Sequence, residues 1–413
     1  MEVQLPRLKY FFPDSQDFID PSFNFFKETR NEHRIRQRDD LYPHEVFSRP
    51  YDGMLVSKAV VDGLGTGESK YSRPQRLRFF REGMSRFFRL PENMESMGDC
   101  GAFTYVTQYE PPYRVEDVIN FYDASQFDYG VSLDHIVFGY EKVGRSFSEA
   151  ELFEFNRRKE LTLSLADEFL IKSKNSKFIP FGVAHGWDKV SYADSVKQLI
   201  SMGYEYITMG GMVPLKTEQI IETLEEVSLV RKSNTKLHLL GIARPQELAR
   251  FSNLGVVSID STTPLQQAFK DRKNNYHTIS GKNYVAIRVP QLDGNVSLGR
   301  KIKSGAINQD VARELEKATL KALFEYSEKR VTLSYTLDIL LAYERLHSGE
   351  KNAISIKDDY EKTLADRPWE SCSCEICREI GINVVIFRGA ERNRRRGFHN
   401  IQVFYEKLTS VLD

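Results

Sequence analysis

Short runs rich in β-forming residues recur between residues 50 and 265 and alternate with stretches that have helical spacing. The runs lie at 53–61, 129–138, 178–184, 204–211, 236–243 and 255–261. Between them, apolar residues recur every three to four positions, as in SYADSVKQLISM at 191–202 and TEQIIETLEEVSLV at 217–230. Strand, helix, strand repetition requires parallel strands with helical crossovers. The pattern therefore predicts the α/β class.

Two arrangements of parallel strands compete, an open doubly wound sheet and a closed barrel. The open sheet usually carries a glycine-rich phosphate loop after its first strand, and the chain has neither GxGxxG nor GxxxxGK[ST]. A (β/α)8 barrel, the TIM-barrel fold, is therefore favoured. The 413 residues suit one such barrel with insertions. Catalytic residues should then lie where strands end and their loops begin.

We expect three parts along the chain. Residues 1–50 are rich in aromatic and charged residues and do not fit the repeat, so they are predicted to be an N-terminal extension. Residues 51–365 should form the barrel, and the helical region 308–348 should supply its last crossover helices. Residues 366–413 hold a cysteine cluster and should form a small subdomain packed on the barrel.

Composition limits the class of protein and its partners. Hydrophobic residues make up 41% and charged residues 28%, which is globular rather than disordered composition. No segment resembles a signal peptide and no apolar run approaches the roughly 20 residues that cross a bilayer. We therefore expect a cytoplasmic protein without a membrane partner. The formal net charge is zero, so any nucleic-acid site must come from local clusters of basic residues.

Three basic clusters could provide such local charge. A solvated surface is the usual reason for runs of this kind, and contact with phosphate is the alternative interpretation. The clusters are Arg34, Arg36 and Arg38; Lys270, Arg272 and Lys273; and Arg392, Arg394, Arg395 and Arg396.

Three of the four cysteines lie within six residues, in CSCEIC. In a reducing compartment, thiols this close together favour a metal over disulfides. Cys372, Cys374 and Cys377 would supply three ligands, and His399 would complete a closed tetrahedral shell, which is typical of structural Zn²⁺. The spacing by itself leaves the fourth ligand open. Three unligated thiols and a surface histidine are the alternative.

Two aspartates stand at expected strand ends. Asp99 lies between glycines in GDCGAFTY, ahead of an expected aromatic strand, and Asp260 ends the apolar run in SIDSTTP. An acid in such a place commonly caps a turn. From the pattern alone, a catalytic role and a capping role both stay open.

Six motifs follow one another in a specific order. They are GDCGAF, DYGVSLD, GVAHG, MGGMVPL, HLLGIARPQELARFSNLGVVSIDS, and CSCEIC followed by FHN. Their order resembles that of the tRNA-guanine transglycosylases, whose versions look like DSGGF, DIGxxLD, a VQG element, IGGxVPL, GxGxP closing on FDS, and CxCxxC with a distant HN. The resemblance runs from about residue 53 to 405. It implies a (β/α)8 barrel with a zinc-bound insertion.

The resemblance also implies roles for particular residues. Asp260 matches the family's nucleophile and Asp99 its general acid/base. The residues that match the base pocket are Cys100, Asp134, His185, Gly210, Gly211 and Met212, with Asp134 reading the purine edge. The chain departs from the family at Cys100, where a serine is usual, and at Thr104 and His185, where glutamine is usual. These departures affect the choice of base and polymer.

The N-terminal sequence differs from that of ordinary tRNA-modifying members of the family. It resembles the DNA 7-deazaguanine transglycosylases, in the segments LPRLKYFFPDSQDFIDPSFNF, RDDLYPHEVF and PYDGMLVSK. The resemblance thus implies an enzyme that replaces guanine in DNA with preQ0 (7-cyano-7-deazaguanine) through a covalent aspartyl-sugar intermediate.

Two other functions stay open. One is a tRNA-guanine transglycosylase with an unusual N-terminus. The other is a non-catalytic zinc-bearing subunit of a transglycosylase pair, which the presence of both acids disfavours. A homodimer and partner proteins of a DNA-modification system are compatible with the sequence.

Overall fold

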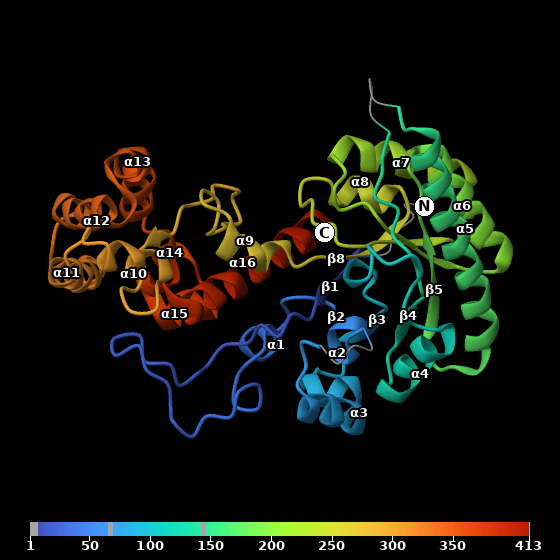
Figure 1. Ribbon diagram of the computed structural model, residues 1–413, viewed down its shortest axis with the longest axis horizontal. Coiled ribbons are helices and arrows are strands. Elements are labelled where there is room, and N and C mark those ends of the chain that lie inside the picture. The colour runs from blue at the N-terminus through green and yellow to red at the C-terminus, as the bar shows by residue number, and fades with distance from the viewer. Residues whose placement is uncertain (1–6, 65–68, 142–145, 413) are drawn as a thin grey trace. The chain divides into compact units, whose positions relative to one another are not determined.

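The structure is a computed structural model that describes residues 7–64, 69–141 and 146–412. Eight parallel strands form a closed barrel, because each pairs with the next and β8 pairs with β1 (Figure 1). The strands are β1 (Lys9–Pro13), β2 (Gly53–Ser57), β3 (Glu95–Asp99), β4 (Tyr129–Val131), β5 (Ile179–Ala184), β6 (Tyr206–Met209), β7 (Lys236–Leu239) and β8 (Val256–Asp260). The predicted α/β class and barrel are confirmed.

Helices follow the strands, and Figure 1 shows α5, α6 and α7 along the outside of the sheet. In α6, Asp188 caps the first turn by accepting a hydrogen bond from the Ser191 N–H, Val196 and Leu199 are buried, and Gly203 ends the helix at φ 116°. The helices of this region are α2 (Lys58–Asp62), α3 (Arg73–Phe88), α4 (Val115–Ser125), α5 (Glu149–Lys172), α6 (Lys189–Met202), α7 (Thr217–Val230) and α8 (Leu248–Asn253).

The sequence pattern misses two strands. β1 lies within the residues that were expected to be an extension, and β3 ends at Asp99, whereas a strand was expected after Asp99. Residues 102–104 form a 3-10 turn instead, and residues 58–61 begin α2 rather than continue β2. β3 has the sequence ESMGD, with Met97 as its one large apolar side chain, so it carries little strand signal of its own.

The barrel interior is filled with apolar side chains. Phe11, Leu55, Met97, Val131, Phe181 and Val183, from the first five strands, form one buried cluster. Phe181 also packs on Tyr206, with ring centroids 4.7 Å apart. Because apolar side chains fill most of this layer, catalytic side chains are expected at the carboxyl ends of the strands.

The described residues divide into two compact units. The barrel unit contains residues 7–16, 51–262 and 408–412, and the second unit contains Asp17–Pro50 and Thr263–Lys407. The barrel unit thus includes β1, and its central segment ends at Thr262. These limits differ from the predicted barrel limits of 51 and 365. The helices of region 308–348 belong to the second unit and not to the barrel.

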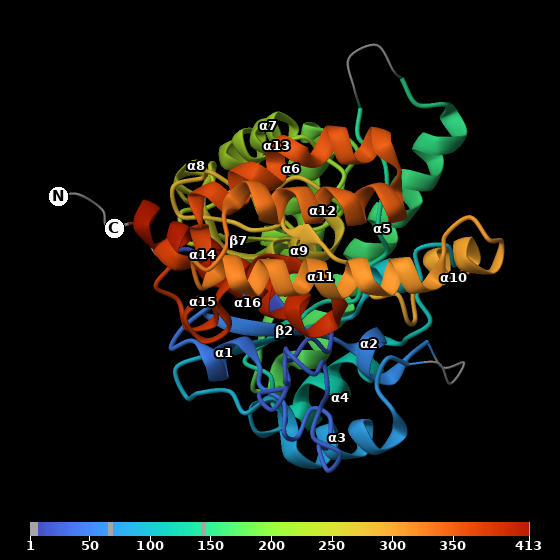
Figure 2. The ribbon, with the colours of Figure 1, turned by 90° about the vertical axis from the view of Figure 1, so that its left-hand side faces the viewer.

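The second unit is mainly helical. Figure 2 shows α11, α12 and α13 side by side, and α12 contacts both of the others. The elements of this unit are α1 (Pro43–Val46), α9 (Thr263–Lys270), β9 (Ile287–Arg288), α10 (Val296–Lys303), α11 (Gln309–Ser327), α12 (Leu333–Ser348), α13 (Glu350–Asp366), α14 (Pro368–Ser371), α15 (Glu375–Ile380), β10 (Ile386–Phe387) and most of α16 (Gly389–Leu412). Among the described helices, none has the length and apolar character needed to cross a membrane.

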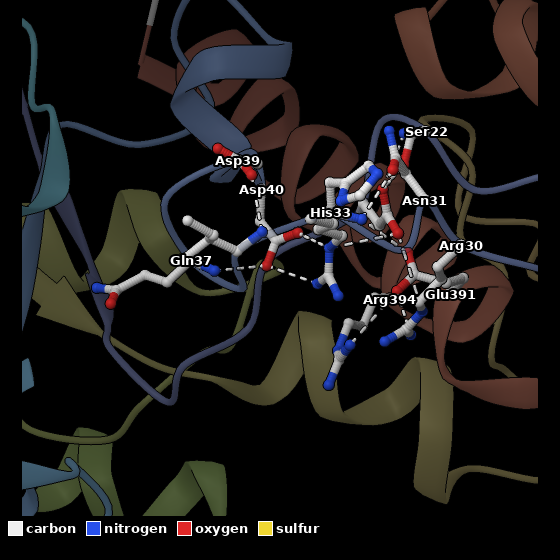
Figure 3. Close-up of polar contacts among 12 residues, drawn as sticks. Ser22, Arg30, Asn31, His33, Gln37, Asp39, Asp40, Glu391 and Arg394 are labelled. Atoms are coloured by element: carbon white, nitrogen blue, oxygen red, sulfur yellow. Dashed lines mark hydrogen bonds and ion pairs between the residues drawn. The ribbon is translucent and has the colours of Figure 1, made fainter.

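Ion pairs connect the irregular segment 17–50 to α16. Arg30 contacts Glu391 at 2.7 Å, and Arg394 lies 3.7 Å from the same carboxylate (Figure 3). Glu391 also accepts a hydrogen bond from the Asp20 backbone N–H at 3.1 Å. Segment 17–50 contains only a short helix and isolated bridges, so it has no ladder of backbone hydrogen bonds like that of a strand. Side-chain contacts with α16 hold the segment instead.

Most of the arginine cluster on α16 is internal. Arg392, Arg395 and Arg396 are at most 1% exposed. Arg392 donates to Glu28, and Arg396 donates to backbone carbonyl groups, including that of Ala268 at 2.7 Å. Burial and charge pairing explain these residues, so they are not a surface for phosphate. In the first cluster, Arg34 is likewise paired with Asp40.

Replacing Glu28 with alanine should destabilise the second unit. Glu28 pairs with Arg388 at 2.6 Å and Arg392 at 2.5 Å, and both guanidinium groups are buried. Losing the carboxylate leaves the buried Arg392 without its acidic partner and Arg388 with Glu316 alone, which should cost about 3–5 kcal/mol of unfolding free energy. Denaturant unfolding followed by circular dichroism measures the change. Glu314→Ala removes an exposed carboxylate and should cost under about 1 kcal/mol. Equal losses in the two variants would contradict the prediction.

Candidate active site and metal centre

Three buried carboxylates lie at the carboxyl ends of barrel strands. Asp99 is the last residue of β3, Asp260 is the last residue of β8, and Asp134 follows β4. Their exposed fractions are 8%, 5% and 1%. Parallel strands bring their carboxyl ends to the same edge of a barrel. The structure thus gathers the predicted catalytic pair and the predicted base reader at this edge.

Asp99 is held by two donors and made less acidic by its surroundings. The Ser57 hydroxyl donates to its Oδ2 at 2.7 Å, and the Gly101 backbone N–H donates to the same atom at 2.9 Å. Burial raises the pKa of Asp99 to about 7, and the neighbouring charge of Asp134 acts in the same direction. A carboxyl group with a pKa near neutrality can both give and take a proton at pH 7.

Asp260 is held by two neighbouring groups. His238 Nε2 lies 3.1 Å from Asp260 Oδ1, and the Gly241 backbone N–H donates to the same oxygen at 2.8 Å. His238 Nδ1 lies 2.8 Å from the Ser258 hydroxyl. When the Nε2–H group donates a hydrogen bond to Asp260, Nδ1 accepts a hydrogen bond from Ser258. These contacts fix the imidazole ring beside the carboxylate.

His238 was not among the site residues predicted from the sequence. It lies on β7 in the run KLHL, and its register partner on β8 is Ser258. The available signal was a histidine on one apolar strand and a serine on the next strand, two residues before Asp260. Their proximity depends on the pairing of β7 with β8, which the sequence does not reveal.

The predicted base-binding residues Cys100, Asp134 and His185 form one hydrogen-bond network. His185 Nε2 lies 2.7 Å from Asp134 Oδ2, and the Cys100 thiol donates to Asp134 Oδ1 at 2.9 Å. Burial raises the pKa of Cys100 well above its usual range, and the charge of Asp134 adds to this effect. The thiol is therefore a hydrogen-bond donor here and not a nucleophile. Each carboxylate oxygen can accept a further hydrogen bond.

The two glycines after β6 lie against His185. A Cβ atom on Gly210 would meet the His185 ring at 2.4 Å, and one on Gly211, which has φ 73°, would approach its Nδ1 at 3.1 Å. The Tyr192 hydroxyl donates to the Gly210 carbonyl at 2.8 Å. Met212 is fully buried next to them. Only glycine permits this close approach of backbone and imidazole.

Two exposed aromatic rings come from the loops that carry the base-site residues. Phe103 and Phe138 are 50% and 45% exposed, and their ring centroids lie 5.6 Å apart. Neither ring was predicted from the sequence, although both follow predicted site residues within four positions. Thr104, one of the departures from the family pattern, is exposed.

The four predicted metal ligands also come together, within the second unit. Their ligand atoms all lie within 4.8 Å of one another. The sulfur atoms of Cys372, Cys374 and Cys377 lie 3.7, 3.4 and 3.5 Å from His399 Nδ1. A tetrahedral ion with sulfur and nitrogen ligands would space such atoms about 3.6 Å apart. The group can therefore hold a metal ion, and it is consistent with zinc.

Neighbouring groups orient the histidine ligand. His399 Nε2 lies 2.8 Å from the His277 carbonyl oxygen, so the proton on Nε2 leaves Nδ1 free to bind a metal. The Tyr276 ring stacks on His399 with centroids 4.2 Å apart. The next residue, Asn400, accepts a hydrogen bond from the His277 N–H at 3.0 Å. These contacts explain the FHN motif, because both of its polar residues hold one loop.

Comparison with known proteins identifies the class. No family model matches the chain. A DNA-guanine transglycosylase of Salmonella montevideo is 70% identical over 408 residues, which cover 99% of this chain and 98% of the relative. A tRNA-guanine(15) transglycosylase of Methanococcus aeolicus is 29% identical over 188 residues, 44% of this chain and 27% of the relative. A queuine tRNA-ribosyltransferase of Buchnera aphidicola is 26% identical over 132 residues, 32% and 34% of the two chains.

The names of all three relatives describe pentosyltransferases. The chain has a closed barrel and is an enzyme of this class. More particularly, it belongs to the DNA-guanine transglycosylase family, within the larger group that includes the tRNA-guanine transglycosylases. The resemblance inferred from the six motifs is confirmed.

Replacing Asp99 with asparagine should stabilise the fold in a pH-dependent way. The folded pKa of Asp99, about 7, is raised above the unfolded value, so its favourable contribution is complete at low pH and is lost as pH rises through 7. Asp99→Asn has no such loss. Between the ordinary aspartate pKa of about 3.9 and pH 7, the variant should gain about 1.4 kcal/mol over the native chain per pH unit.

Denaturant unfolding at several pH values measures this difference. Glu225→Gln changes an exposed carboxylate of the same unit and should show a difference that does not depend on pH. A pH-independent difference for Asp99→Asn as well would show that Asp99 titrates normally.

Proposed function

We propose that this enzyme exchanges guanine in DNA for the 7-deazaguanine base preQ0 through a covalent aspartyl-sugar intermediate. The placement of Asp99 and Asp260 at the carboxyl ends of β3 and β8 carries the proposal. The full-length relative that is named for DNA supports DNA as the polymer. Exchange in tRNA is the second candidate, because the two partial relatives are named for tRNA.

Asp260 has the features that a nucleophile at the sugar requires. Breaking the bond between the sugar C1′ and guanine N9 leaves an oxocarbenium-like carbon, which a carboxylate oxygen on the opposite face can capture. The hydrogen bonds from Gly241 and His238 both reach Oδ1, which leaves Oδ2 to form the new bond. His238 would position Asp260 for this attack.

Asp99 would act as the general acid and then as the general base in the two half-reactions. Protonated Asp99 gives a proton to the departing guanine, and the resulting carboxylate takes the N9 proton of the incoming base. That base then attacks C1′ and expels Asp260. Two inversions give net retention at C1′, and the proton count balances. A pKa of about 7 allows both states of Asp99 at neutral pH.

The Asp134 network would recognise the purine edge. An ionised carboxylate accepts hydrogen bonds from the N1–H and the exocyclic amino group of guanine, an arrangement that adenine does not offer. Cys100 and His185 already orient both oxygens of Asp134, which reduces the cost of arranging them on binding. Guanine and preQ0 share this edge, so the network would accept both as small-molecule substrates. Phe103 and Phe138 offer flat apolar faces to a base outside its stack.

We further propose that the metal is one structural Zn²⁺. Three thiolates and an imidazole occupy all four tetrahedral positions, which leaves none for a catalytic water. The bound ion would fix α15, which begins after Cys374, to the His399 turn of α16. It would take no part in proton transfer or in attack at C1′.

Labelled guanine tests the proposed function directly. The purified chain is incubated with radiolabelled guanine and either duplex DNA or unmodified tRNA, and the polymer is then recovered and counted. We expect label in DNA. Unlabelled preQ0 should compete and should itself enter the DNA, as mass spectrometry of digested nucleosides would show. Label in tRNA alone would support the second candidate and overturn the first.

Asp260→Asn should lower guanine exchange by at least about 10³-fold, because an amide is a poor nucleophile and the covalent intermediate cannot form. Denaturing gels with labelled DNA should show a protein-linked species for the native chain and none for the variant. Asp123→Asn alters an exposed carboxylate on α4 and should retain full exchange. A covalent adduct in the Asp260→Asn variant would assign the nucleophile elsewhere.

Cys374→Ser should lose zinc and thermal stability together. Removing one of four ligands weakens a structural site, whose binding energy contributes to folding. Metal analysis should give about one zinc ion per native chain and clearly less in the variant. Cys100→Ser is the matched control, because Cys100 lies in the barrel unit, and it should retain full zinc. A Cys374→Ser protein with full zinc and unchanged melting would refute the site.

A further inference from the structure

A pocket of the second unit is lined by basic residues that the exchange chemistry does not use. Its volume is about 450 Å³. Lys270, Arg272 and Lys273 line it from the end of α9, Arg288 lines it from β9, and Asn352 and Ser355 line it from α13. None of these residues belongs to the metal site or to the carboxylate edge of the barrel.

The charges at this pocket are available to a ligand. Within the described residues, neither Arg272 nor Lys273 has a carboxylate at ion-pair distance, and both are exposed. Arg288 packs on the Phe387 ring at 5.4 Å and likewise has no ion pair there. Lys270 donates a hydrogen bond to the uncharged amide of Gln266 at 2.9 Å and not to a carboxylate. By contrast, Arg34 and Arg392, from the other two basic clusters, are paired inside the protein.

Two of the acids that line the pocket are already engaged. Asp271 accepts the backbone N–H groups of Lys273 at 2.8 Å and Asn274 at 3.0 Å, which shapes the basic loop. Glu344 lies 3.3 Å from His347 and accepts a hydrogen bond from the Tyr360 hydroxyl at 3.2 Å. Asp359 is the third acid in the lining. The lining thus has four basic and three acidic side chains, and this excess of positive charge favours an anionic ligand.

We propose that this pocket binds the phosphodiester backbone of the DNA substrate. The inference rests on the proposed function. The chain has no net charge, so it does not attract a polyanion as a whole, and affinity must come from a local group of cations. Guanidinium and ammonium groups bind phosphate oxygens, and the amide of Asn352 and the hydroxyl of Ser355 add uncharged donors. Backbone contacts of this kind hold a strand without reading its sequence.

Salt-dependent binding tests the proposal. Fluorescence anisotropy of a labelled duplex gives Kd at several salt concentrations for the native chain and for Arg272→Ala/Lys273→Ala. The variant should bind about tenfold more weakly at moderate salt, and its log–log salt slope should be smaller by about one per lost phosphate contact. In the guanine-exchange assay, KM for DNA should rise while kcat at saturating DNA stays unchanged. Arg288→Ala should reduce the slope by about one on its own.

Lys317→Ala/Lys321→Ala is the matched control. It removes two exposed charges from α11 in the same unit, with side chains 69% and 74% exposed, and it should leave Kd, slope and KM at native values. The proposal is overturned if the pocket variant and the control have the same Kd and the same salt slope. That result would also be obtained if the pocket bound a small phosphorylated molecule instead of DNA. Failure of the native chain to exchange guanine in DNA would instead count against the proposed function, because binding is measured separately.

Discussion

The pairing of β8 with β1 closes the barrel, and the placement of the site follows from it. In the register of this pair, Asp260 lies beside Phe11, and across the next pairs Ser57 lies beside Asp99. Phe11 belongs to the apolar layer that fills the interior. Apolar side chains fill most of the interior, and the reactive carboxylates lie at the carboxyl ends of the strands. The open edges of an unclosed sheet would separate these residues.

Three carboxylates at one buried edge would repel each other if all were charged in the same surroundings. The structure gives each a different environment. Asp260 has donors on one oxygen, Asp134 has a donor on each, and Asp99 is mainly desolvated. Burial, with the neighbouring charge of Asp134, raises the pKa of Asp99 toward neutrality. Such separation of neighbouring acids is how one site obtains both an anion and a proton donor at the same pH.

The second unit uses charge differently, because its arginines are largely structural. Segment 17–50 has little regular structure, and the carboxylates of Glu28 and Asp40 meet guanidinium groups in its interior contacts. Arginine suits this purpose because its planar group satisfies several acceptors at once. The cost is that each buried pair depends on both partners. The loop after α9 is the exception, since Arg272 and Lys273 line a pocket and form no ion pair with a described carboxylate.

The sequence predicted the α/β class, the barrel, the family and the group of four candidate metal ligands, because periodicity and ordered motifs are local properties of the chain. It did not reveal β1, which is short and lies outside the strand–helix repeat, or β3, which has few apolar residues, since such segments become strands only when their neighbours pair with them. The interior positions of Arg392 and Arg395 depend on contacts between segments more than 300 residues apart, such as those with Glu28 and Asp20. Only the tertiary structure places His238 on Asp260 and both Cys100 and His185 on Asp134. These contacts join different strands, and strand register is set by the packing of the whole barrel and by no single segment.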